Sequence, residues 1–401
     1  IIELIDNSEN LKAGVQSRAE NLADRIVPFS FLGFGLTLLL TRNITKAVSI
    51  LMVDYSCAIK LSTPISVISA IREAADHHIT VKGGKYLEAV AEANTIVFDK
   101  TGTLTKAKPA VRRVYTFCDK EEDELLCLAA CLEEHFPHSM ARAVVAGAAA
   151  KGLEHEEMHS KVEYVVAHGI SSSIDGKKVI IGSYHFVFED EGCVIPEDKI
   201  ELYESLSKAH SHLFMGIDGR LAAVISIKDP VRPESAEVVA KLKELGIKKV
   251  VMMTGDSDRT AKAIAEQVGV DEYYSEVLPE DKAKFVEAEK AAGRKVIMVG
   301  DGINDSPALS ASDAGIAVSD GAEIAREIAD ITVSADNLYE LVTLKELSNK
   351  LMSRINRNYR KIVTINTGLI ILGVMGVIQP TTSALLHNSS CLLYTSDAAD
   401  D

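Results

Sequence analysis

The sequence is poor in cysteine, has no tryptophan and carries less positive than negative charge. Its six cysteines include no Cys-x-x-Cys pair, so neither a disulfide framework nor a zinc ribbon is indicated. Cys127 and Cys131 share one helix face in an apolar stretch, and we interpret them as core residues rather than metal ligands. The formal net charge of −15 argues against a nucleic-acid partner, and 401 residues suffice for about two or three domains.

Neither a signal peptide nor an initiator methionine begins the sequence. Because the first residue is Ile1, we expect the chain to be a piece of a longer protein. At the other end, residues 391–401 read CLLYTSDAADD and look like the translation of a sequencing adapter rather than a natural acidic tail. We therefore leave these residues out of the fold prediction.

The most informative segment is an apolar run, residues 95–98, that ends at Asp99 and continues as Lys-Thr-Gly-Thr. In open α/β sheets, ligands bind at the carboxyl ends of the strands. The small residues after Asp99 predict a tight turn whose N–H groups can face a phosphate. An aspartate held there can attack the γ-phosphate of ATP and become an aspartyl-phosphate. The alternative is an aspartate that only caps the next element.

Three later segments supply the other parts of a phosphoryl-transfer site. The apolar run 250–253 precedes Thr254-Gly255-Asp256, and the run 296–299 precedes Gly300-Asp301. Between them, residues 278–282 offer a lysine. Phosphoryl transfer needs a nucleophile, Mg²⁺ ligands and cations that neutralise the phosphoryl oxygens, and these segments contain all three.

Together these motifs resemble the P-type ATPases, in particular their heavy-metal-transporting branch, over nearly all of residues 1–390. The resemblance implies ATP and Mg²⁺ as cofactors and Asp99 as the phosphorylated nucleophile. It also implies a set of supporting residues. Asp99, the Thr101 carbonyl and Asp301 would hold Mg²⁺; Thr254 and Lys282 would contact the phosphoryl group; Lys100, Thr101 and Gly255 would bind the cofactor; Asp256, Asn304 and Asp305 would complete the shell.

One position separates a pump from a phosphatase. Soluble hydrolases of the same fold usually carry a second aspartate two positions after the nucleophile, as general acid and base. This chain has Thr101 there, which would let the phosphoenzyme persist, as a pump requires. Asp229-Pro230 and Arg232 match the family's second hinge between its two cytoplasmic domains.

Residues 109–222 form an insertion between the hinges. Residues 121–152 have helical periodicity, and residues 161–181 contain short β-prone runs with a turn at Asp175-Gly176. The insertion resembles the small nucleotide-binding domain of heavy-metal pumps. Glu133, His138, Gly169 and Gly182 match its nucleotide site, whereas Ser139 and Ala167 replace a proline and a glycine of the family pattern.

The fold class that we expect is α/β. Apolar strand runs alternate with amphipathic helices and predict a doubly wound parallel sheet. The resemblance implies a phosphorylation domain of the haloacid dehalogenase-like (HAD-like) type with an inserted α+β nucleotide-binding domain, flanked by transmembrane helices. The predicted domains are a connector (1–25), a membrane hairpin (26–71), the phosphorylation domain (72–108 and 223–345), the nucleotide-binding domain (109–222), and stalk and membrane helices (346–390).

Apolar runs on both flanks predict the membrane helices. Residues 26–40 and 44–71 read as a hairpin, and residues 362–378 as a third helix, followed by a turn at Gln379-Pro380 and a short fourth helix over 381–390. Buried helices of a soluble protein are the alternative. The third run is preceded by basic residues typical of a cytoplasmic helix end and contains glycines spaced for close helix contact. These are Arg354, Arg357, Arg360 and Lys361, and Gly368, Gly373 and Gly376.

The second hairpin arm contains the candidate transport site. Heavy-metal pumps typically carry Cys-Pro-Cys where this chain has Tyr55-Ser56-Cys57, so only the second cysteine remains. One thiolate beside the carboxylate of Asp54 suits a divalent ion such as zinc or cadmium, and manganese, iron, cobalt and copper are alternatives. His387 aligns with an aspartate of zinc-type members and would complete the set. Mutual neutralisation of Asp54 and Lys60 is the competing interpretation.

Together with the resemblance, these features predict an ATP-driven exporter of a metal cation. We expect it in a membrane, in particular a bacterial plasma membrane, with cytoplasmic catalytic domains and no obligate protein partner. The actuator domain, which carries the family's Thr-Gly-Glu loop, is not in the sequence. We therefore expect the chain to accept phosphate from ATP without completing transport. A soluble phosphatase or phosphotransferase is the main alternative; a non-catalytic metal-binding membrane protein and a potassium-type pump subunit are lesser ones.

Overall fold

The computed structural model describes residues 14–53, 55–106, 109–134, 139–153, 163–165, 169–174, 176–206, 210–301, 305–318, 327–334 and 336–397. Residue contacts divide the chain into two compact units. Unit 1 comprises residues 1–96, 240–248 and 283–401, and unit 2 comprises residues 97–239 and 249–282. Each unit therefore combines segments that are far apart in the sequence.

The first sheet has seven strands in the order β1-β13-β12-β11-β2-β9-β10. Neighbouring strands β9 and β10, β11 and β12, and β12 and β13 are parallel, and only the short β1 is recorded as antiparallel to its neighbour β13. Every residue of β2, β11 and β12 is buried, as expected for parallel strands covered on both faces. The strands are β1 (Thr80–Val81), β2 (Thr95–Asp99), β9 (Lys249–Met253), β10 (Glu272–Tyr274), β11 (Val296–Gly300), β12 (Ala314–Val318) and β13 (Ile331–Val333).

Helices alternate with these strands, which confirms the predicted α/β pattern. The chain runs from β9 through α10 to β10, then through α11 to β11 and through α12 to β12. Such strand–helix–strand units build parallel sheets because a crossover is needed to bring the chain back to the same end. The helices are α9 (Ser235–Glu244), α10 (Asp258–Val268), α11 (Pro279–Ala291) and α12 (Ser306–Ala311).

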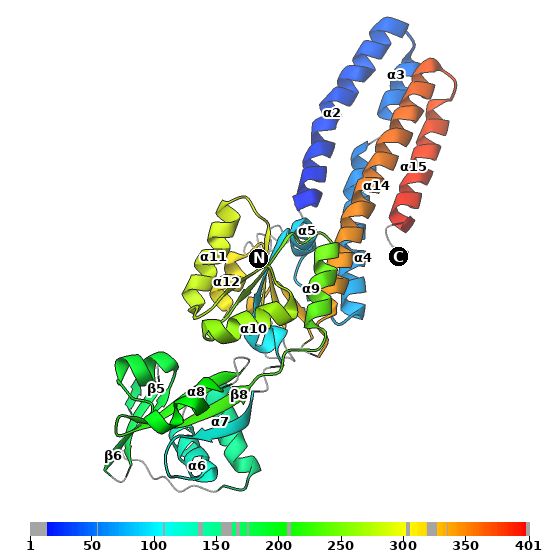
Figure 1. The fold of residues 1–401 in the computed structure, drawn as a ribbon. Coiled ribbons are helices and arrows are strands. Elements are labelled where there is room, and N and C mark those ends of the chain that lie inside the picture. Colours follow the sequence, from blue (N-terminus) through cyan, green and yellow to red (C-terminus); the bar gives the residue numbers. More distant parts are fainter. Residues whose placement is uncertain are drawn as a thin grey trace. The chain divides into compact units, whose positions relative to one another are not determined.

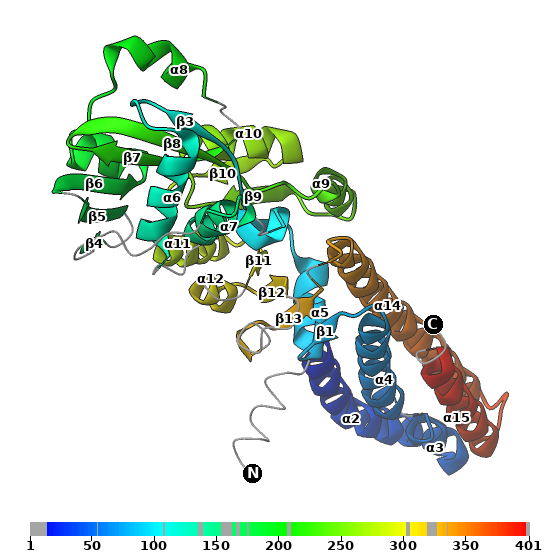
Figure 2. The ribbon, with the colours of Figure 1, turned by 90° about the horizontal axis from the view of Figure 1, so that it is seen from below.

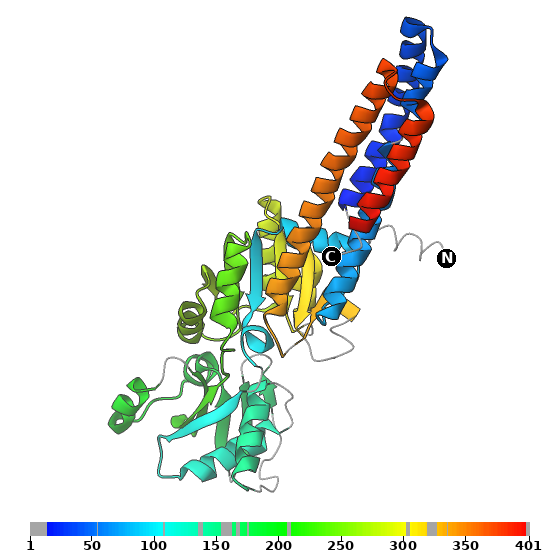
Figure 3. The same ribbon diagram turned by 90° about the vertical axis from the view of Figure 1, so that its right-hand side faces the viewer.

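Unit 1 also contains a group of long helices that lie side by side (Figure 1). Helix α4 packs against α2 and α14, and α15 packs against α14 and α4. Figure 3 shows α14 as one continuous helix that leaves this group and runs on beside α5. The helices are α2 (Gly14–Thr41), α3 (Ile44–Leu51), α4 (Tyr55–Asp76), α5 (Gly84–Glu92), α14 (Glu340–Met375) and α15 (Pro380–Asp397).

The first predicted helix break is confirmed, and a second one was missed. Asn43 caps α3, since its side chain accepts a hydrogen bond from the N–H of Lys46. The run 44–71 was expected to be one membrane arm, but α3 ends at Leu51 and α4 begins only at Tyr55. The Met52 N–H bonds to the Val48 carbonyl and closes α3, so this arm consists of two helices.

The three glycines of α14 differ in role. A Cβ at Gly373 would lie 2.6 Å from the Cβ of Ser49, so close helix contact is confirmed at this position. Gly368 has nothing within 4 Å of its ideal Cβ, and the predicted contact is wrong there. Gly376 has a φ of 81° and ends the helix as a left-handed cap. The predicted turn before Pro380 is confirmed, because α15 begins at that residue.

By length and composition, one helix within the described residues could cross a membrane. The segment is Asp24–Thr41 of α2, which has a mean hydropathy of 1.3 and no buried residue. It includes the whole of the first apolar run, residues 26–40, whereas the other predicted membrane segments lie in helices with more polar residues. The membrane topology beyond this segment stays a prediction.

Unit 2 is built on a six-stranded sheet in the order β3-β8-β7-β6-β5-β4. Its strand pairs are antiparallel, and Gly176 makes the predicted turn between β5 and β6 with a φ of 78°. The strands are β3 (Ala110–Thr116), β4 (Glu163–Val165), β5 (Gly169–Ile174), β6 (Lys177–Gly182), β7 (Ser211–Ile217) and β8 (Arg220–Lys228).

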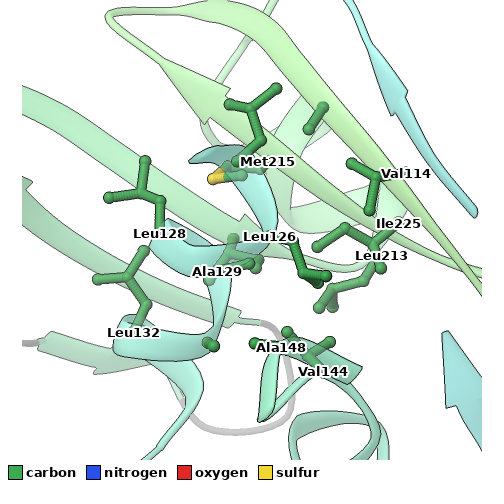
Figure 4. Packing of buried hydrophobic residues seen from close by; sticks show 14 of the residues in the cluster. Val114, Leu126, Leu128, Ala129, Leu132, Val144, Ala148, Leu213, Met215 and Ile225 are labelled. Atoms are coloured by element: carbon green, nitrogen blue, oxygen red, sulfur yellow. The ribbon is translucent and has the colours of Figure 1, made fainter. Parts of the chain in front are cut away.

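Both faces of this sheet are covered. Leu213, Met215 and Ile225 pack against α6 (Glu122–Glu133) and α7 (Ser139–Ala150), as Figure 4 shows. Figure 2 shows the ribbon of this sheet with α6 and α7. Phe214 and Val224 point to the opposite face, because side chains alternate along a strand. That face is covered by η2 (His185–Asp190) and α8 (Ile200–Glu204).

Candidate active site

The phosphorylation site predicted at Asp99 has a lysine in contact with it. Asp99 ends β2, whose residues are all buried, and the aspartate itself is 7% exposed. The Nζ of Lys282, at the start of α11, donates to Asp99 Oδ1 at 2.6 Å. Both side chains are therefore withdrawn from water, and each charge needs the other because desolvating a lone ion is costly. A carboxylate beside a fixed cation can approach an anionic phosphate.

The turn after Asp99 is held in one conformation. Gly102 has a φ of 79°, a left-handed conformation that favours glycine, while Thr101 is extended. The Arg232 guanidinium donates to the carbonyls of Gly102 and Thr105, each at 3.2 Å. The Thr105 hydroxyl donates to Asp229, which precedes the predicted hinge proline. Thus the segment expected to be a hinge fixes the phosphate turn, a role that the sequence analysis missed.

The second phosphate-type turn follows β9. Thr254 is 2% exposed, and its hydroxyl accepts a hydrogen bond from the N–H of Asp256 at 3.1 Å. The Asp256 carboxylate pairs with Lys100, so two residues predicted for the site contact each other directly. Gly255 leaves room for a side chain, because the nearest atom to an ideal Cβ is the Val277 carbonyl at 3.9 Å. Packing therefore does not require glycine at position 255.

The start of β7 contacts the same turn. Ser211 donates to Asp256 Oδ2 at 3.3 Å, and the Thr260 hydroxyl donates to the His210 carbonyl, also at 3.3 Å. Burial lowers the pKa of His212 to about 4, and this histidine is therefore neutral at physiological pH. These contacts join the inserted sheet to the carboxylate that pairs with Lys100. The sequence analysis did not identify them, because they join residues about 45 positions apart.

The third predicted segment follows β11 and belongs to unit 1. Asp301 is half-buried and Asp305, the residue before α12, is 1% exposed. A Cβ at Gly300 would lie 2.3 Å from Asp305 Oδ2, so glycine is required there by the position of this carboxylate. Asn304 lies outside the described residues. The Gly-Asp pair at the end of an apolar run was the signal for this segment.

The predicted nucleotide residues are placed in part. Glu133 is 2% exposed near the end of α6, and His138 lies outside the described residues. Gly169 and Gly182 are directly opposite each other in the β5–β6 register. A Cβ at Gly169 would come within 2.3 Å of the Phe186 ring and 2.5 Å of the Ile181 carbonyl. Packing alone therefore requires glycine at position 169, whether or not a nucleotide binds.

Of the three residues predicted for the transport site, the structure describes the side chain of His387 alone. Asp54 and the side chain of Cys57 lie outside the part of the chain that is described. His387 is buried on α15, and its Nδ1 lies 3.2 Å from Oδ1 of Asn366 on α14. Lys60 pairs with Asp24 at 2.5 Å. Over the described residues no group of three or more His, Cys, Asp or Glu side chains is placed to hold a metal ion. Asn366 was missed, although an amide inside an apolar run was a visible signal.

Comparisons with known proteins agree with this geometry. A family model described as haloacid dehalogenase-like hydrolase matches residues 93–313. The chain is 36% identical over 402 residues to a zinc-exporting P-type ATPase of Mycobacterium marinum, covering 100% of this chain and 55% of that protein. It is 34% identical over 401 residues to a manganese-exporting P-type ATPase of Mycobacterium bovis, covering 100% and 56%.

Among solved structures, a zinc-transporting PIB-type ATPase in the E2.Pi state matches with a TM-score of 0.71 and 29% identity. The match covers 94% of this chain and 62% of that one. The chain spans about half the length of the curated relatives that it matches. Relatives along the whole length of the chain are metal-exporting P-type ATPases. Because the family model matches residues 93–313, which include the nucleophile motif and most strands of the parallel sheet, the chain belongs to the haloacid dehalogenase-like hydrolases.

Proposed function

We propose that this chain is the catalytic and ion-conducting part of an ATP-driven exporter of a divalent metal cation such as zinc or cadmium, situated in a bacterial plasma membrane. The observation that carries the proposal is the buried Asp99–Lys282 pair at the end of β2. The names of the relatives support export, and the zinc and manganese exporters are similar enough that manganese is a second candidate cargo.

In the proposed reaction, a carboxylate oxygen of Asp99 attacks the γ-phosphorus of ATP, and the bond to the β,γ-bridging oxygen breaks. ADP leaves and an acyl phosphate remains on the chain. Lys282 would neutralise the phosphoryl oxygens as charge develops on them, and Thr254 would donate a hydrogen bond. Because Thr101 stands where phosphatases have their acid–base aspartate, the acyl phosphate would survive until water is activated from elsewhere.

Mg²⁺ fits the donor set that we propose for it. Asp99, Asp301 and the Thr101 carbonyl supply oxygen ligands, which this ion prefers. Strand β11, which precedes Asp301, is next to β2 in the strand order. When bound, the ion would offset the negative charge of the transferred phosphoryl group. Lys100, Gly255, Asp256, Asn304 and Asp305 would shape the surrounding hydrogen-bonded shell.

For the nucleotide we propose Glu133, His138, Gly169 and Gly182, which lie on α6, after it, and on the paired strands β5 and β6. For the exported ion we propose Cys57, Asp54 and His387. The placement of His387 supports this assignment, because the ring is buried and held in one orientation, with Nδ1 3.2 Å from Oδ1 of Asn366 and Nε2 3.7 Å from Sγ of Cys391.

The test is phosphorylation of the purified chain in detergent micelles by γ-labelled ATP with Zn²⁺, Cd²⁺ or Mn²⁺. We expect a hydroxylamine-sensitive label that one metal enhances and that Asp99→Asn abolishes, whereas the exposed Asp198→Asn leaves it unchanged. Label in Asp99→Asn would contradict the nucleophile. A label that turns over at once, with steady release of phosphate from p-nitrophenyl phosphate, would favour the soluble phosphatase instead.

A further inference from the structure

A basic hollow lies on α14 and contains none of the residues proposed above for phosphate, nucleotide or the exported ion. It has a volume of about 490 Å³ and is lined by Ser353, Asn356, Arg357, Arg360 and Lys361. These positions follow the i, i+3, i+4, i+7, i+8 spacing of a single helix face. Three side chains are cationic, two are neutral hydrogen-bonding groups, and none of the lining residues is acidic. The hollow therefore fits an anion.

The five lining residues lie on the exposed face of the helix. All of them are exposed, whereas the opposite face of α14 carries the buried residues Leu351, Ile355 and Ile362. Packing thus explains the apolar residues of the buried face, whereas the basic face is exposed and cationic. Three cations within two turns also repel one another, since like charges at i, i+4 destabilise a helix. A counter-charge that binds to this face removes that cost.

The next part of the same helix is apolar and exposed. Val363 is 50% exposed, Ile371 52% and Met375 64%. From Arg360 to Met375 the helix rises about 22 Å, a length comparable to that of a phospholipid acyl chain. A soluble anion would use only the hollow, but an anionic phospholipid would use both parts, with its phosphate between the cations and its chains along the apolar face.

We propose that the hollow formed by Arg357, Arg360 and Lys361 binds the headgroup of an anionic phospholipid from the cytoplasmic leaflet. This inference rests on the membrane placement in the proposed function but not on phosphoryl transfer. Its ligand is a membrane component rather than the exported ion or ATP.

The absence of tryptophan makes the site easy to probe. Thr364 is exposed one turn beyond Arg360, so Thr364→Trp places the chain's single indole beside the hollow. The chain carrying this substitution is reconstituted into vesicles that contain either phosphatidylglycerol or phosphatidylcholine brominated near the headgroup end of its chains. Bromine quenches indole fluorescence on contact, so the ratio of the two quenching curves reports the preference for the anionic lipid.

We expect phosphatidylglycerol to be preferred about fivefold or more, the factor that one basic residue near an anionic surface contributes. Arg357→Gln, Arg360→Gln and Lys361→Gln together should reduce the preference to about one. The matched control removes three exposed charges of unit 2, as Arg112→Gln, Lys177→Gln and Arg220→Gln, and should retain it. Far-UV circular dichroism confirms that both triple variants are folded.

Equal quenching by the two lipids, or a preference that survives in the α14 triple variant, would overturn the proposal. So would loss of the preference when inorganic phosphate is added at constant ionic strength, which would identify a soluble-anion site. Quenching by neither lipid would overturn the membrane placement itself. Asp99→Asn serves as the separating control, because it should abolish phosphorylation and leave the lipid preference intact.

Discussion

The turn after β2 and the helix pair α14 and α15 both contain polar groups in apolar surroundings, but they differ in how those groups are satisfied. At the turn, Lys282 pairs with Asp99 and Lys100 pairs with Asp256. On α14, both side-chain polar atoms of Asn358 and the Nδ2 of Asn366 are buried without a hydrogen-bond partner among the described residues. An unsatisfied buried amide costs free energy, so it is retained only where something else compensates.

This difference teaches that the two regions are specified in different ways. At the turn, Asp99 and Lys100 are each paired with an ion from a distant segment, and among the described residues the Thr103 hydroxyl is a buried group without a hydrogen-bond partner. In the helices, buried amide atoms of Asn358 and Asn366 have no hydrogen-bond partner among the described residues. The ligand that these helices bind therefore depends on a few side chains from separate segments. We therefore expect changes at the turn to act on the reaction as a whole and changes on the helices to act on packing and cargo.

The largest effect should come from Lys282→Met. Removing the cation beside Asp99 should slow formation of the acyl phosphate about 10²-fold to 10³-fold. Since a buried carboxylate then loses its charged partner, the free energy of unfolding should fall by about 3 kcal/mol. Single-turnover labelling and urea denaturation measure the two effects. The exposed Lys262→Met on α10 is the control, and equal behaviour of the two variants would show that the turn does not depend on this pair.

A smaller effect is expected in the helices from Gly373→Ala. Its new methyl group would meet Ser49 at 2.6 Å, and forcing such contacts costs about 2 kcal/mol. Gly368→Ala is the matched substitution on the same helix, where nothing lies within 4 Å and alanine should add about 1 kcal/mol of helix stability. Thermal denaturation in one detergent compares them. Shifts of the same sign would contradict the packing of α14 against α3.

The last prediction concerns the dependence of stability on pH. Lys345 is buried on α14 and donates to the carbonyls of Val90 at 2.7 Å and Ala91 at 2.9 Å, at the end of α5. Burial lowers its pKa to about 8 from the usual 10.5. Between these values the unfolded chain binds more protons than the folded chain. Stability from this group should therefore rise with pH, by at most about 1.4 kcal/mol per pH unit.

Lys345→Met should remove that rise between pH 8 and 10.5. Urea denaturation at several pH values in this range measures it, with the exposed Lys262→Met as the control substitution. If the wild-type chain loses stability as steeply as the Lys345 variant over this window, the lysine is not buried in the way described here.

Much of the candidate phosphate site could be predicted from the sequence, because its signals are local. The run before Asp99 and the glycine of the following turn lie within eight residues, and strand burial confirms the predicted parallel sheet. The contact of Arg232 with the Gly102 carbonyl could not be predicted, since it joins residues 130 positions apart. The helices were harder still. The break between α3 and α4 lies inside a run that hydrophobicity alone joins, and the Asn366–His387 contact depends on how two helices face each other.

Helix α14 contains 36 residues and no proline, and its first glycine is Gly368. Over about 54 Å it behaves as a stiff rod, because an uninterrupted helix lacks the defects at which sharp kinks form. One end is fastened to α5 through Lys345, and the other carries Asn366 against His387. For a rod of this length a tilt of 5° at one end displaces the far end by about 5 Å. Unit 1 thus contains a helix long enough to turn a small tilt at one end into a displacement of several ångströms at the other.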